Sequence, residues 1–279
     1  MRVVLAKKIG FCFGVRRAIE MAEAALKNKE TVYSLGSIIH NKQVVNKLSE
    51  KGLRVIKDIG KVKKGVIVVS SHGISPEIAS RIRKRGLRFI DTTCPFVRKA
   101  QRIGRSLSDA HYDVIIVGDS SHPEVKALVG FVSGNVFVVK DKNEAKRLNL
   151  RPNGRFSIIS QTTQSVDNFL DVAKAILDKR PKELKVINTI CKDVEARQEA
   201  ARALTKVVDK MLVVGGKTSA NTKRLYDVCR RISGKVYRIE TDEDLDSAWF
   251  KTGRVVGITS GSSTPDWIVR RVVNKVKGS

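Results

Sequence analysis

Residues 91–103 read DTTCPFVRKAQRI and place Cys94 between an apolar, strand-like run and the expected start of a helix. Proline is favoured at the first helical position, so Pro95 supports this register. A helix N-terminus carries unpaired N–H groups and positive partial charge, which lower a thiol pKa and favour the thiolate that ligates or attacks. A structural cysteine would pack equally well on the strand itself. We therefore interpret Cys94 as a residue that ligates a metal or acts as a nucleophile.

The same arrangement occurs twice more along the chain. Cys12 lies in 10-GFCFGVRRAIEMAEAAL-26 and Cys191 in 188-NTICKDVEARQEAARAL-204, each between an apolar run and a helical pattern. The cysteines are 82 and 97 residues apart, so the spacing indicates an internal repeat.

Polar residues recur at matching places in the three repeats. A second apolar run in each repeat is followed, 28 residues after the cysteine, by a polar residue, and a third run ends in hydroxyl or imidazole groups. These positions are His40, His122 and Ser219 after the second run, and His72, Thr162 and Ser263 after the third.

Each repeat therefore reads helix, strand, polar loop, helix, short connection, strand, polar loop, helix, and a strand into the next cysteine. Such alternation predicts parallel sheets with right-handed crossovers, and open α/β sheets bind ligands at the carboxyl ends of their strands. We predict an α/β fold of three pseudo-threefold-related units around a shared centre; the alternative is three similar βα turns matched by chance. The predicted units span residues 13–93, 94–190 and 191–279, and the N-terminal strand in residues 1–12 closes the third.

Composition limits the class of protein. A chain of 279 residues with 42% hydrophobic content can bury a core. No apolar run approaches the ~18 residues that span a bilayer, and no signal-peptide pattern is present, so we expect a cytoplasmic protein with no membrane partner. The net charge of +26 suits nucleic acid, but aromatic residues make up only 5% and no nucleic-acid-binding motif occurs. We expect no nucleic-acid partner and keep a basic nucleic-acid-binding protein as an alternative.

The cysteines suggest a metal centre. Four cysteines in a reducing compartment favour metal binding or catalysis over disulfides, and the C-x-x-C pairs of structural zinc sites are absent. Three widely spaced thiolates fit a 4Fe–4S cluster with one open iron, a Lewis acid for a substrate hydroxyl. A three-ligand zinc site and separate buried thiols remain open. Cys229 lies mid-helix on an apolar face and is expected in the core.

Ordered motifs extend over essentially the whole chain: GFCFGVRRAI, HNKQVV, SSHGISPE, DTTCPFV, SHPEV, SQTTQSVD, TICKDVEARQEA, TSANTKRL and TSGSSTPDWIV. They resemble the 4-hydroxy-3-methylbut-2-enyl diphosphate reductase family, also called IspH or LytB. The resemblance implies an iron–sulfur oxidoreductase of the non-mevalonate (MEP) pathway of isoprene biosynthesis. Members remove an allylic hydroxyl with two electrons and protons, giving isopentenyl and dimethylallyl diphosphate. The resemblance also implies three α/β domains around one oxygen-sensitive 4Fe–4S cluster per chain, held by Cys12, Cys94 and Cys191.

The resemblance further implies site residues and partners. The substrate is a small-molecule diphosphate, and imidazoles, small hydroxyls and helix N-termini can all donate to its anionic oxygens. No nucleotide-binding motif is present, so the electrons would come from an external donor such as ferredoxin or flavodoxin. A monomer or weak homo-oligomer is expected. The implied residues are His40, His72 and His122 with Ser219, Asn221 and Ser263 for diphosphate, Glu124 for proton delivery, and Thr162 as its partner.

The chain departs from the family pattern at three places. Ala220 stands where a serine is usual, Asp119 stands where a histidine is common, and KDVEARQ follows Cys191. A lost hydroxyl would weaken phosphate binding by about 1 kcal/mol. Two rival enzyme classes stay open, namely quinolinate synthase-like proteins and dehydratases that also use three cysteines.

Overall fold

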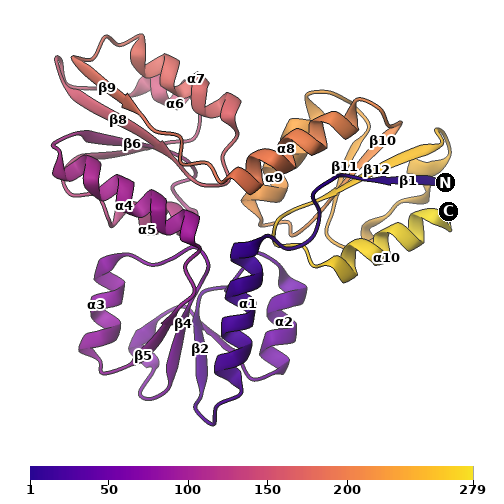
Figure 1. The fold of residues 1–279 in the computed structure, drawn as a ribbon, viewed down its shortest axis with the longest axis horizontal. Coiled ribbons are helices and arrows are strands. Elements are labelled where there is room, and N and C mark those ends of the chain that lie inside the picture. The colour runs from indigo at the N-terminus through magenta and orange to yellow at the C-terminus, as the bar shows by residue number, and fades with distance from the viewer. Residues whose placement is uncertain (279) are drawn as a thin grey trace. The chain divides into compact units, whose positions relative to one another are not determined.

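The computed structural model describes residues 1–278 and contains three four-stranded sheets in which every strand pairing is parallel (Figure 1). The predicted α/β class with parallel sheets is therefore confirmed. Residue 279, the last of the predicted third unit, lies outside the described residues. The chain forms two compact units, one comprising Met1–Arg16, Ile39–Lys47 and the chain from Lys192 on, the other Arg17–Ile38 and Leu48–Cys191. The boundaries expected at residues 13–93, 94–190 and 191–279 stay a prediction.

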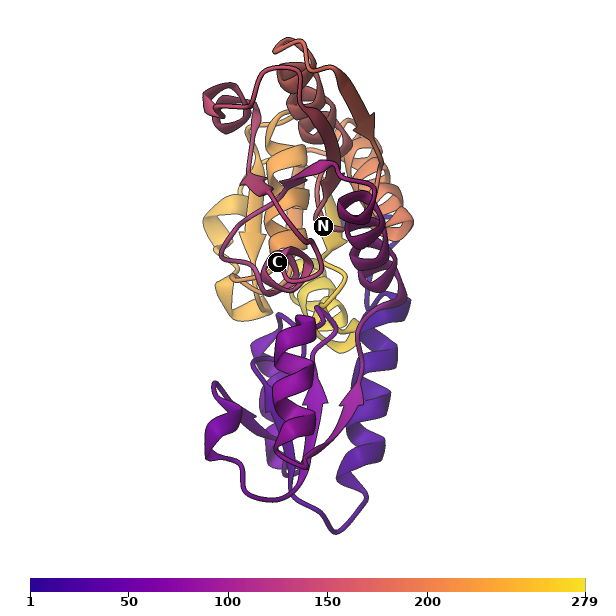
Figure 2. The ribbon, with the colours of Figure 1, turned by 90° about the vertical axis from the view of Figure 1, so that its left-hand side faces the viewer.

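Sheet B forms from the first repeat. Its strand order is β3-β2-β4-β5, and β4 is buried along its whole length. Figure 2 shows α3 in front of these strands. The elements are α1 (Phe13–Leu26), β2 (Val32–Leu35), α2 (Lys42–Glu50), β3 (Arg54–Ile56), η1 (Ile59–Lys61), β4 (Val66–Val69), α3 (Pro76–Lys84) and β5 (Arg88–Asp91).

Sheet C forms from the second repeat and has the order β7-β6-β8-β9. Its core places apolar residues of α4 and α5 against β6 and β8, and Figure 1 shows α6 and α7 on the opposite face. The elements are α4 (Pro95–Asp109), β6 (Asp113–Val117), α5 (Pro123–Val129), β7 (Val136–Val139), α6 (Lys142–Arg147), β8 (Arg155–Ser160), α7 (Val166–Leu177) and β9 (Glu183–Val186).

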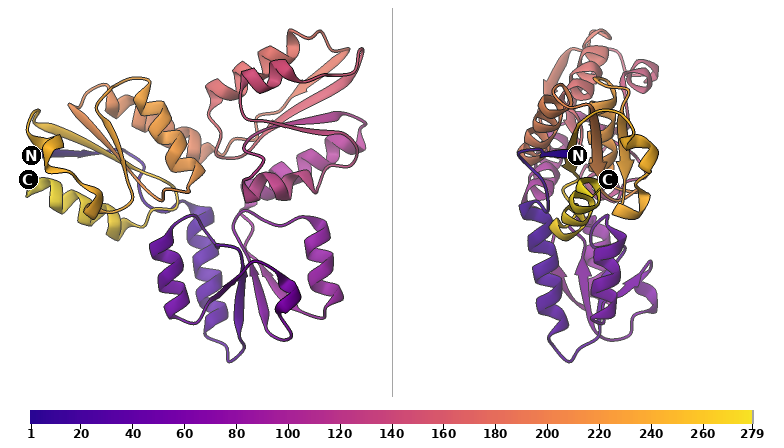
Figure 3. Two further views of the ribbon diagram at one scale, coloured as in Figure 1. Left: turned by 180° about the vertical axis from the view of Figure 1, so that it is seen from behind. Right: turned by 90° about the vertical axis from the view of Figure 1, so that its right-hand side faces the viewer.

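Sheet A combines the two ends of the chain, with the order β1-β12-β10-β11. Arg2 pairs with Val255, and this confirms that the N-terminal strand completes the last sheet. Figure 3 shows β1 beside α10. The elements are β1 (Arg2–Leu5), α8 (Lys192–Thr205), β10 (Lys210–Val214), α9 (Ala220–Arg230), β11 (Val236–Ile239), η2 (Asp242–Asp244), η3 (Ser247–Phe250), β12 (Val255–Ser260) and α10 (Asp266–Lys277).

All three sheets share one topology. In each, the first strand of the repeat lies beside the third, while the second and fourth lie at the edges. The chain therefore changes direction between the two central strands, and the loops that follow those strands lie at a topological switch point, where doubly wound sheets bind ligands.

Each repeat contains one strand more than the sequence predicted. The strands β3, β7 and β11 lie in what was expected to be a short connection, and each is an edge strand of three or four residues. The central strands β4, β6 and β10 are fully buried and read as continuous apolar runs, which makes them easy to recognise. None of the edge strands β3, β7 and β11 is buried along its whole length.

The structure also bears on membrane insertion. Within residues 1–278, no helix is both long and apolar enough to cross a bilayer.

Candidate active site

Each repeat positions its cysteine by the same backbone hydrogen bond. Each cysteine follows an edge strand (β1, β5 or β9) and directly precedes the first residue of a helix (α1, α4 or α8). Its N–H donates to a carbonyl in the loop after the third strand of the repeat. The three bonds run from Cys12 to Ser262 (3.0 Å), from Cys94 to Ser71 (3.0 Å) and from Cys191 to Thr162 (2.9 Å).

These bonds correct one part of the predicted repeat. The sequence grouped Thr162 with His72 and Ser263, but the cysteine contacts match Thr162 to Ser71 and Ser262 instead. His72 and Ser263 therefore lie one residue further along the loop. Spacing could not reveal this shift because the loops differ in length.

A second hydrogen-bonding arrangement recurs two residues before each cysteine, and it was not predicted from the sequence. Thr92 donates from its hydroxyl to the carbonyl of Val69, at the end of the third strand. The Thr189 hydroxyl donates to the carbonyl of Ser160 (2.6 Å) and accepts from its N–H (2.7 Å). The matching sequences TTC (92–94) and TIC (189–191) could have indicated this shared threonine.

Glycine occupies the equivalent place before Cys12. Gly10 donates its N–H to Ser260 Oγ (2.9 Å) and has a φ of +73°. A Cβ at this position would lie 1.9 Å from Asp266 Oδ1, so the backbone hydrogen bond replaces the threonine hydroxyl here.

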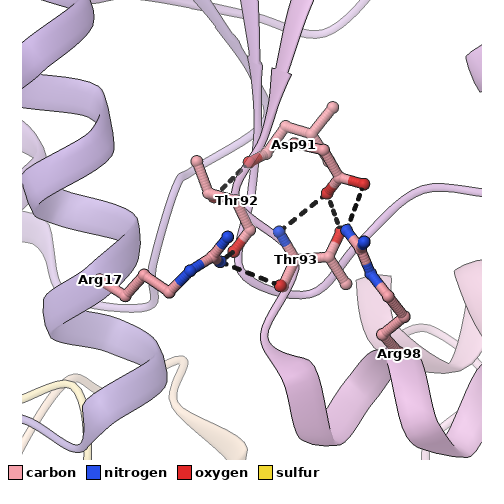
Figure 4. Close-up of polar contacts among 6 residues, drawn as sticks. Arg17, Asp91, Thr92, Thr93 and Arg98 are labelled. Atoms are coloured by element: carbon pink, nitrogen blue, oxygen red, sulfur yellow. Dashed lines mark hydrogen bonds and ion pairs between the residues drawn. The ribbon is translucent and has the colours of Figure 1, made fainter.

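A charged network holds the turn before Cys94 (Figure 4). Arg17 Nη1 donates to the carbonyls of Thr92 and Thr93, each at 3.3 Å. On the other side of the turn, Asp91 accepts from the N–H (2.9 Å) and hydroxyl of Thr93 and pairs with Arg98 (2.6 Å). The peptide that leads into Cys94 is thus fixed from two directions.

The three thiols are partly accessible, and burial opposes the ionisation of Cys12. Cys12, Cys94 and Cys191 are each partly exposed. Burial raises the pKa of the Cys12 thiol, although the N–H groups of Val15 and Gly14 act in the opposite direction. The N–H groups at the helix N-terminus lower the pKa of Cys12 as expected, but burial outweighs them and the net pKa is raised.

Glu124 and Thr162 meet at the switch point of sheet C. Glu124 lies in the first turn of α5, as expected, and its side chain is buried. Its carboxylate accepts the Thr162 N–H (2.6 Å) and the Thr162 hydroxyl (2.9 Å). Burial raises the pKa of Glu124 to about 7, although both hydrogen bonds lower it. The carboxyl is therefore poised to exchange a proton near neutral pH.

Two of the predicted histidines lie together in the same compact unit. The rings of His72 and His122 contact each other edge to face, with centroids 5.2 Å apart. The Glu124 N–H donates to His122 Nδ1 (3.2 Å), so the proton of a neutral His122 ring is on Nε2. That atom is the one able to donate to an anionic ligand.

The third histidine lies in the other compact unit, beside Ser263. Ser263 Oγ donates to the His40 carbonyl (3.2 Å), which joins the loops after β2 and β12. Burial lowers the pKa of His40, so the ring is neutral at pH 7 and would bind an anion as an N–H donor.

The start of α9 holds two more predicted residues of that unit. Ser219 is the N-cap, and its hydroxyl accepts the Thr222 N–H (3.2 Å). Asn221 is 3% exposed, yet neither its side-chain oxygen nor its nitrogen has a hydrogen-bond partner among residues 1–278. Leaving such groups unpaired costs about 1–3 kcal/mol each, which a polar ligand would recover. Ala220 adds no hydroxyl here.

The other two departures from the family pattern have local structural roles. The Asp119 carboxylate accepts the Ser121 N–H (2.8 Å) and hydroxyl (2.7 Å), which holds the pKa of Asp119 below its usual range. After Cys191, Asp193 pairs with buried Arg197 (2.6 Å) across the first turn of α8. Cys229 is fully buried in the core of sheet A, as predicted.

The predicted residues thus form two sets within the described structure. One compact unit carries Cys12, His40, Ser219, Asn221 and Ser263. The other carries Cys94, Cys191, His72, His122, Glu124 and Thr162.

Comparison with known proteins decides the family. A family model described as LytB protein matches residues 3–277. The chain belongs to the LytB family. LytB-family relatives named 4-hydroxy-3-methylbut-2-enyl diphosphate reductase include proteins from Geobacter metallireducens and Pelobacter propionicus. The first is 43% identical, covering 99% of this chain and 97% of the relative, and the second is 46% identical, covering 99% and 98%.

Solved structures agree with this assignment to the LytB family. The E-1-hydroxy-2-methyl-but-2-enyl-4-diphosphate reductase from Plasmodium falciparum is similar with a TM-score of 0.93 and 31% identity, covering 98% of this chain and 87% of that one. A structure of (E)-4-hydroxy-3-methyl-but-2-enyl diphosphate reductase, the terminal enzyme of the non-mevalonate pathway, has a TM-score of 0.70, 39% identity and full coverage of both chains.

Proposed function

We propose that this chain is a 4-hydroxy-3-methylbut-2-enyl diphosphate reductase. The observation that carries the proposal is its relation, at 43% and 46% identity over nearly the whole length, to proteins of that name. The reaction replaces an allylic hydroxyl by hydrogen, consumes two electrons and two protons, and gives isopentenyl and dimethylallyl diphosphate with release of water. The proposal includes a cytoplasmic location and an external electron donor such as ferredoxin or flavodoxin.

The proposed cofactor is a 4Fe–4S cluster held by Cys12, Cys94 and Cys191. The donor set fits, because three partly exposed thiols share one backbone arrangement and the remaining cysteine, Cys229, is buried in the core. Three thiolates match the cluster and leave one iron without a protein ligand. When bound, the cluster supplies the reducing electrons and a Lewis-acidic iron for the substrate hydroxyl.

Glu124 is proposed as the proton donor. A hydroxyl leaves as water only after it gains a proton, and a general acid is most effective when its pKa is near the working pH. Burial sets the pKa of Glu124 at about 7, and Thr162 holds both carboxylate oxygens. The Thr162 hydroxyl, bonded to this carboxyl, can pass the proton to a substrate oxygen within hydrogen-bond reach.

Diphosphate binding is proposed for the polar residues at the strand ends. His122 presents Nε2–H, since Nδ1 accepts the Glu124 N–H. Asn221 contributes a buried amide whose polar atoms are unpartnered. The proposed set is His40, His72, His122, Ser219, Asn221 and Ser263.

An anaerobic assay tests the proposal. Purified, cluster-containing protein should absorb near 400 nm and convert 4-hydroxy-3-methylbut-2-enyl diphosphate to the two isoprenoid diphosphates with dithionite-reduced methyl viologen. Serine at Cys12, Cys94 or Cys191 should remove the absorption and the activity, while Cys229→Ser should retain both. A chromophoric protein that leaves the substrate unchanged would favour another three-cysteine enzyme, such as a quinolinate synthase or dehydratase.

Asn221 offers a separate test of the diphosphate site. Asn221→Leu keeps the side-chain volume and removes the unpartnered polar atoms. The variant should bind inorganic diphosphate about tenfold more weakly by calorimetry, the equivalent of ~1.4 kcal/mol for one ligand hydrogen bond. Asn143→Leu, at an exposed position of α6 in the other compact unit, is the control.

A further inference from the structure

An apolar groove lies on the compact unit that contains Cys12, outside the proposed active site. Its volume is about 590 Å³, and it lies between β1 and one face of α8. Leu5 is 43% exposed and Val207 is 74% exposed, so large hydrophobic side chains face solvent there. A groove that brings such side chains together offers an apolar contact surface to a partner.

The groove has a basic end. Lys7 and Lys8 line it beside the apolar residues, and Glu199 is its single acidic lining residue. The chain as a whole carries a net charge of +26. A groove with this charge attracts an acidic protein and repels a basic one.

The basic end of the groove is also close in sequence to Cys12, a proposed ligand of the cluster. Lys8 is four residues before Cys12, so the chain between them spans at most about 14 Å. Lys8 pairs with Asp193 (3.6 Å), and Asp193 pairs with Arg197 in α8. These ion pairs attach the segment before Cys12 to the helix that forms the groove.

We propose that this groove docks an acidic electron-carrier protein that reduces the enzyme. The inference rests on the proposed reductase function. Each turnover requires R–OH + 2e⁻ + 2H⁺ → R–H + H₂O, so two carrier molecules are oxidised by one electron each. The apolar floor supplies contact area, and Lys7 orients the acidic surface of the carrier.

The test compares two reductants with two matched double variants. Lys7→Glu with Val207→Ser changes the groove, and Lys235→Glu with Ile232→Ser makes the same charge reversal and a comparable aliphatic-to-serine change at exposed positions elsewhere in this unit. An acidic ferredoxin is the probe carrier, and dithionite-reduced methyl viologen is the small reductant. The dissociation constant for ferredoxin is measured by calorimetry at 50 and 300 mM NaCl.

The groove variant should bind ferredoxin at least tenfold more weakly and lose the same factor in ferredoxin-driven kcat/KM, as expected for removing a charged and an apolar contact. Its methyl viologen-driven turnover should stay within about twofold of the parent. The control variant should keep both rates, and raising the salt should weaken ferredoxin binding to the parent.

Three results would overturn the docking proposal. The first is unchanged ferredoxin affinity in the groove variant, and the second is an equal loss in the control. The third is a parent dimer that the groove variant dissociates while ferredoxin binding persists, because the groove would then hold a second copy of this chain. Failure of the reductase proposal is separable, since it would abolish methyl viologen-driven turnover in the parent while the binding comparison still decides docking.

Discussion

Glu124 is the residue whose chemistry depends most on its surroundings. An exposed glutamate at the start of a helix would only interact with the helix dipole, for a few tenths of a kcal/mol. Here the side chain is buried and both of its oxygens are bonded to Thr162. Burial therefore changes a surface anion into a group that holds its proton up to about pH 7.

Replacing this carboxyl should separate binding from turnover. Glu124→Gln keeps an acceptor for the Thr162 N–H but removes the acid, so turnover should fall at least about a hundredfold with cluster absorption and substrate affinity near normal. Glu77→Gln is a matched control, because Glu77 is exposed and also follows a proline in the first turn of its helix. Parent-like turnover in the Glu124 variant would move the proton source elsewhere.

The same carboxyl should make stability depend on pH. Folding raises the pKa of Glu124 from 4.5 to about 7, so the fold favours the protonated form. Its contribution is complete below pH 4.5, falls as the pH rises through 7, and totals about 3 kcal/mol at most. Urea unfolding of cluster-free protein should show the parent losing stability relative to Glu124→Gln between pH 5 and 8. A constant difference across that range would mean that Glu124 is already ionised in the folded protein.

Sequence reasoning identified where Glu124 lies along the chain but not its state. The proline before it predicted the helix start, and the structure confirms Pro123 at the first position of α5. The raised pKa follows from burial of the carboxyl, and the carboxyl is bonded to Thr162, 38 positions away in the sequence. No local pattern encodes such a burial.

At the scale of elements, the recurring unit is the turn that presents each cysteine. All three turns use the same cysteine N–H bond to the loop after the third strand. The repeat in the sequence predicted the turns, but not the side chains that hold them. Arg17, for instance, lies in α1, 75 residues before the Thr92 carbonyl to which it donates.

Arg17 should therefore control the order of the Cys94 turn. Arg17→Gln removes two bonds from a charged donor to backbone carbonyls, and we expect a loss of about 1–2 kcal/mol in unfolding free energy, discounted for partial exposure. In cluster-free protein, Cys94 should also react faster with iodoacetamide, measured by peptide mass spectrometry. Arg16→Gln is the control, since Arg16 is exposed and adjacent. Equal alkylation rates in the two variants would show that Asp91 and Arg98 suffice to hold the turn.

Some short edge strands could not be predicted from the sequence pattern. The strand β3 has only three residues, Arg54–Ile56, of which the first two are exposed. A run this short has no clear alternation, and its structure depends on pairing with β2. The buried central strands were predicted because their apolar runs need no partner to be recognised.

For the whole molecule, the net charge of +26 should make stability depend on salt. Like charges repel more strongly in the compact state, and the Debye length falls from about 20–30 Å near 0.01–0.02 M salt to below 8 Å above 0.15 M. Raising NaCl from 20 to 300 mM should increase Tm by about 2–4 °C, corresponding to ~1 kcal/mol for a chain of this size. Calorimetry with KCl at equal ionic strength provides the control, since screening does not depend on the cation. A salt-independent Tm would show that the charges are already balanced by local ion pairs.

The pairing of β1 with β12 has a consequence for synthesis on the ribosome. Arg2 pairs with Val255, so β1 leaves the ribosome long before the strand with which it pairs. At 5–20 residues per second, that delay is roughly 13–50 s. Sheets B and C, whose strands lie between Val32 and Val186, can form before β12 (Val255–Ser260) has been synthesised, but sheet A can be completed only after it. Until then the segment leading to Cys12 has no sheet to hold it, so the Cys12 turn forms later than the turns at Cys94 and Cys191.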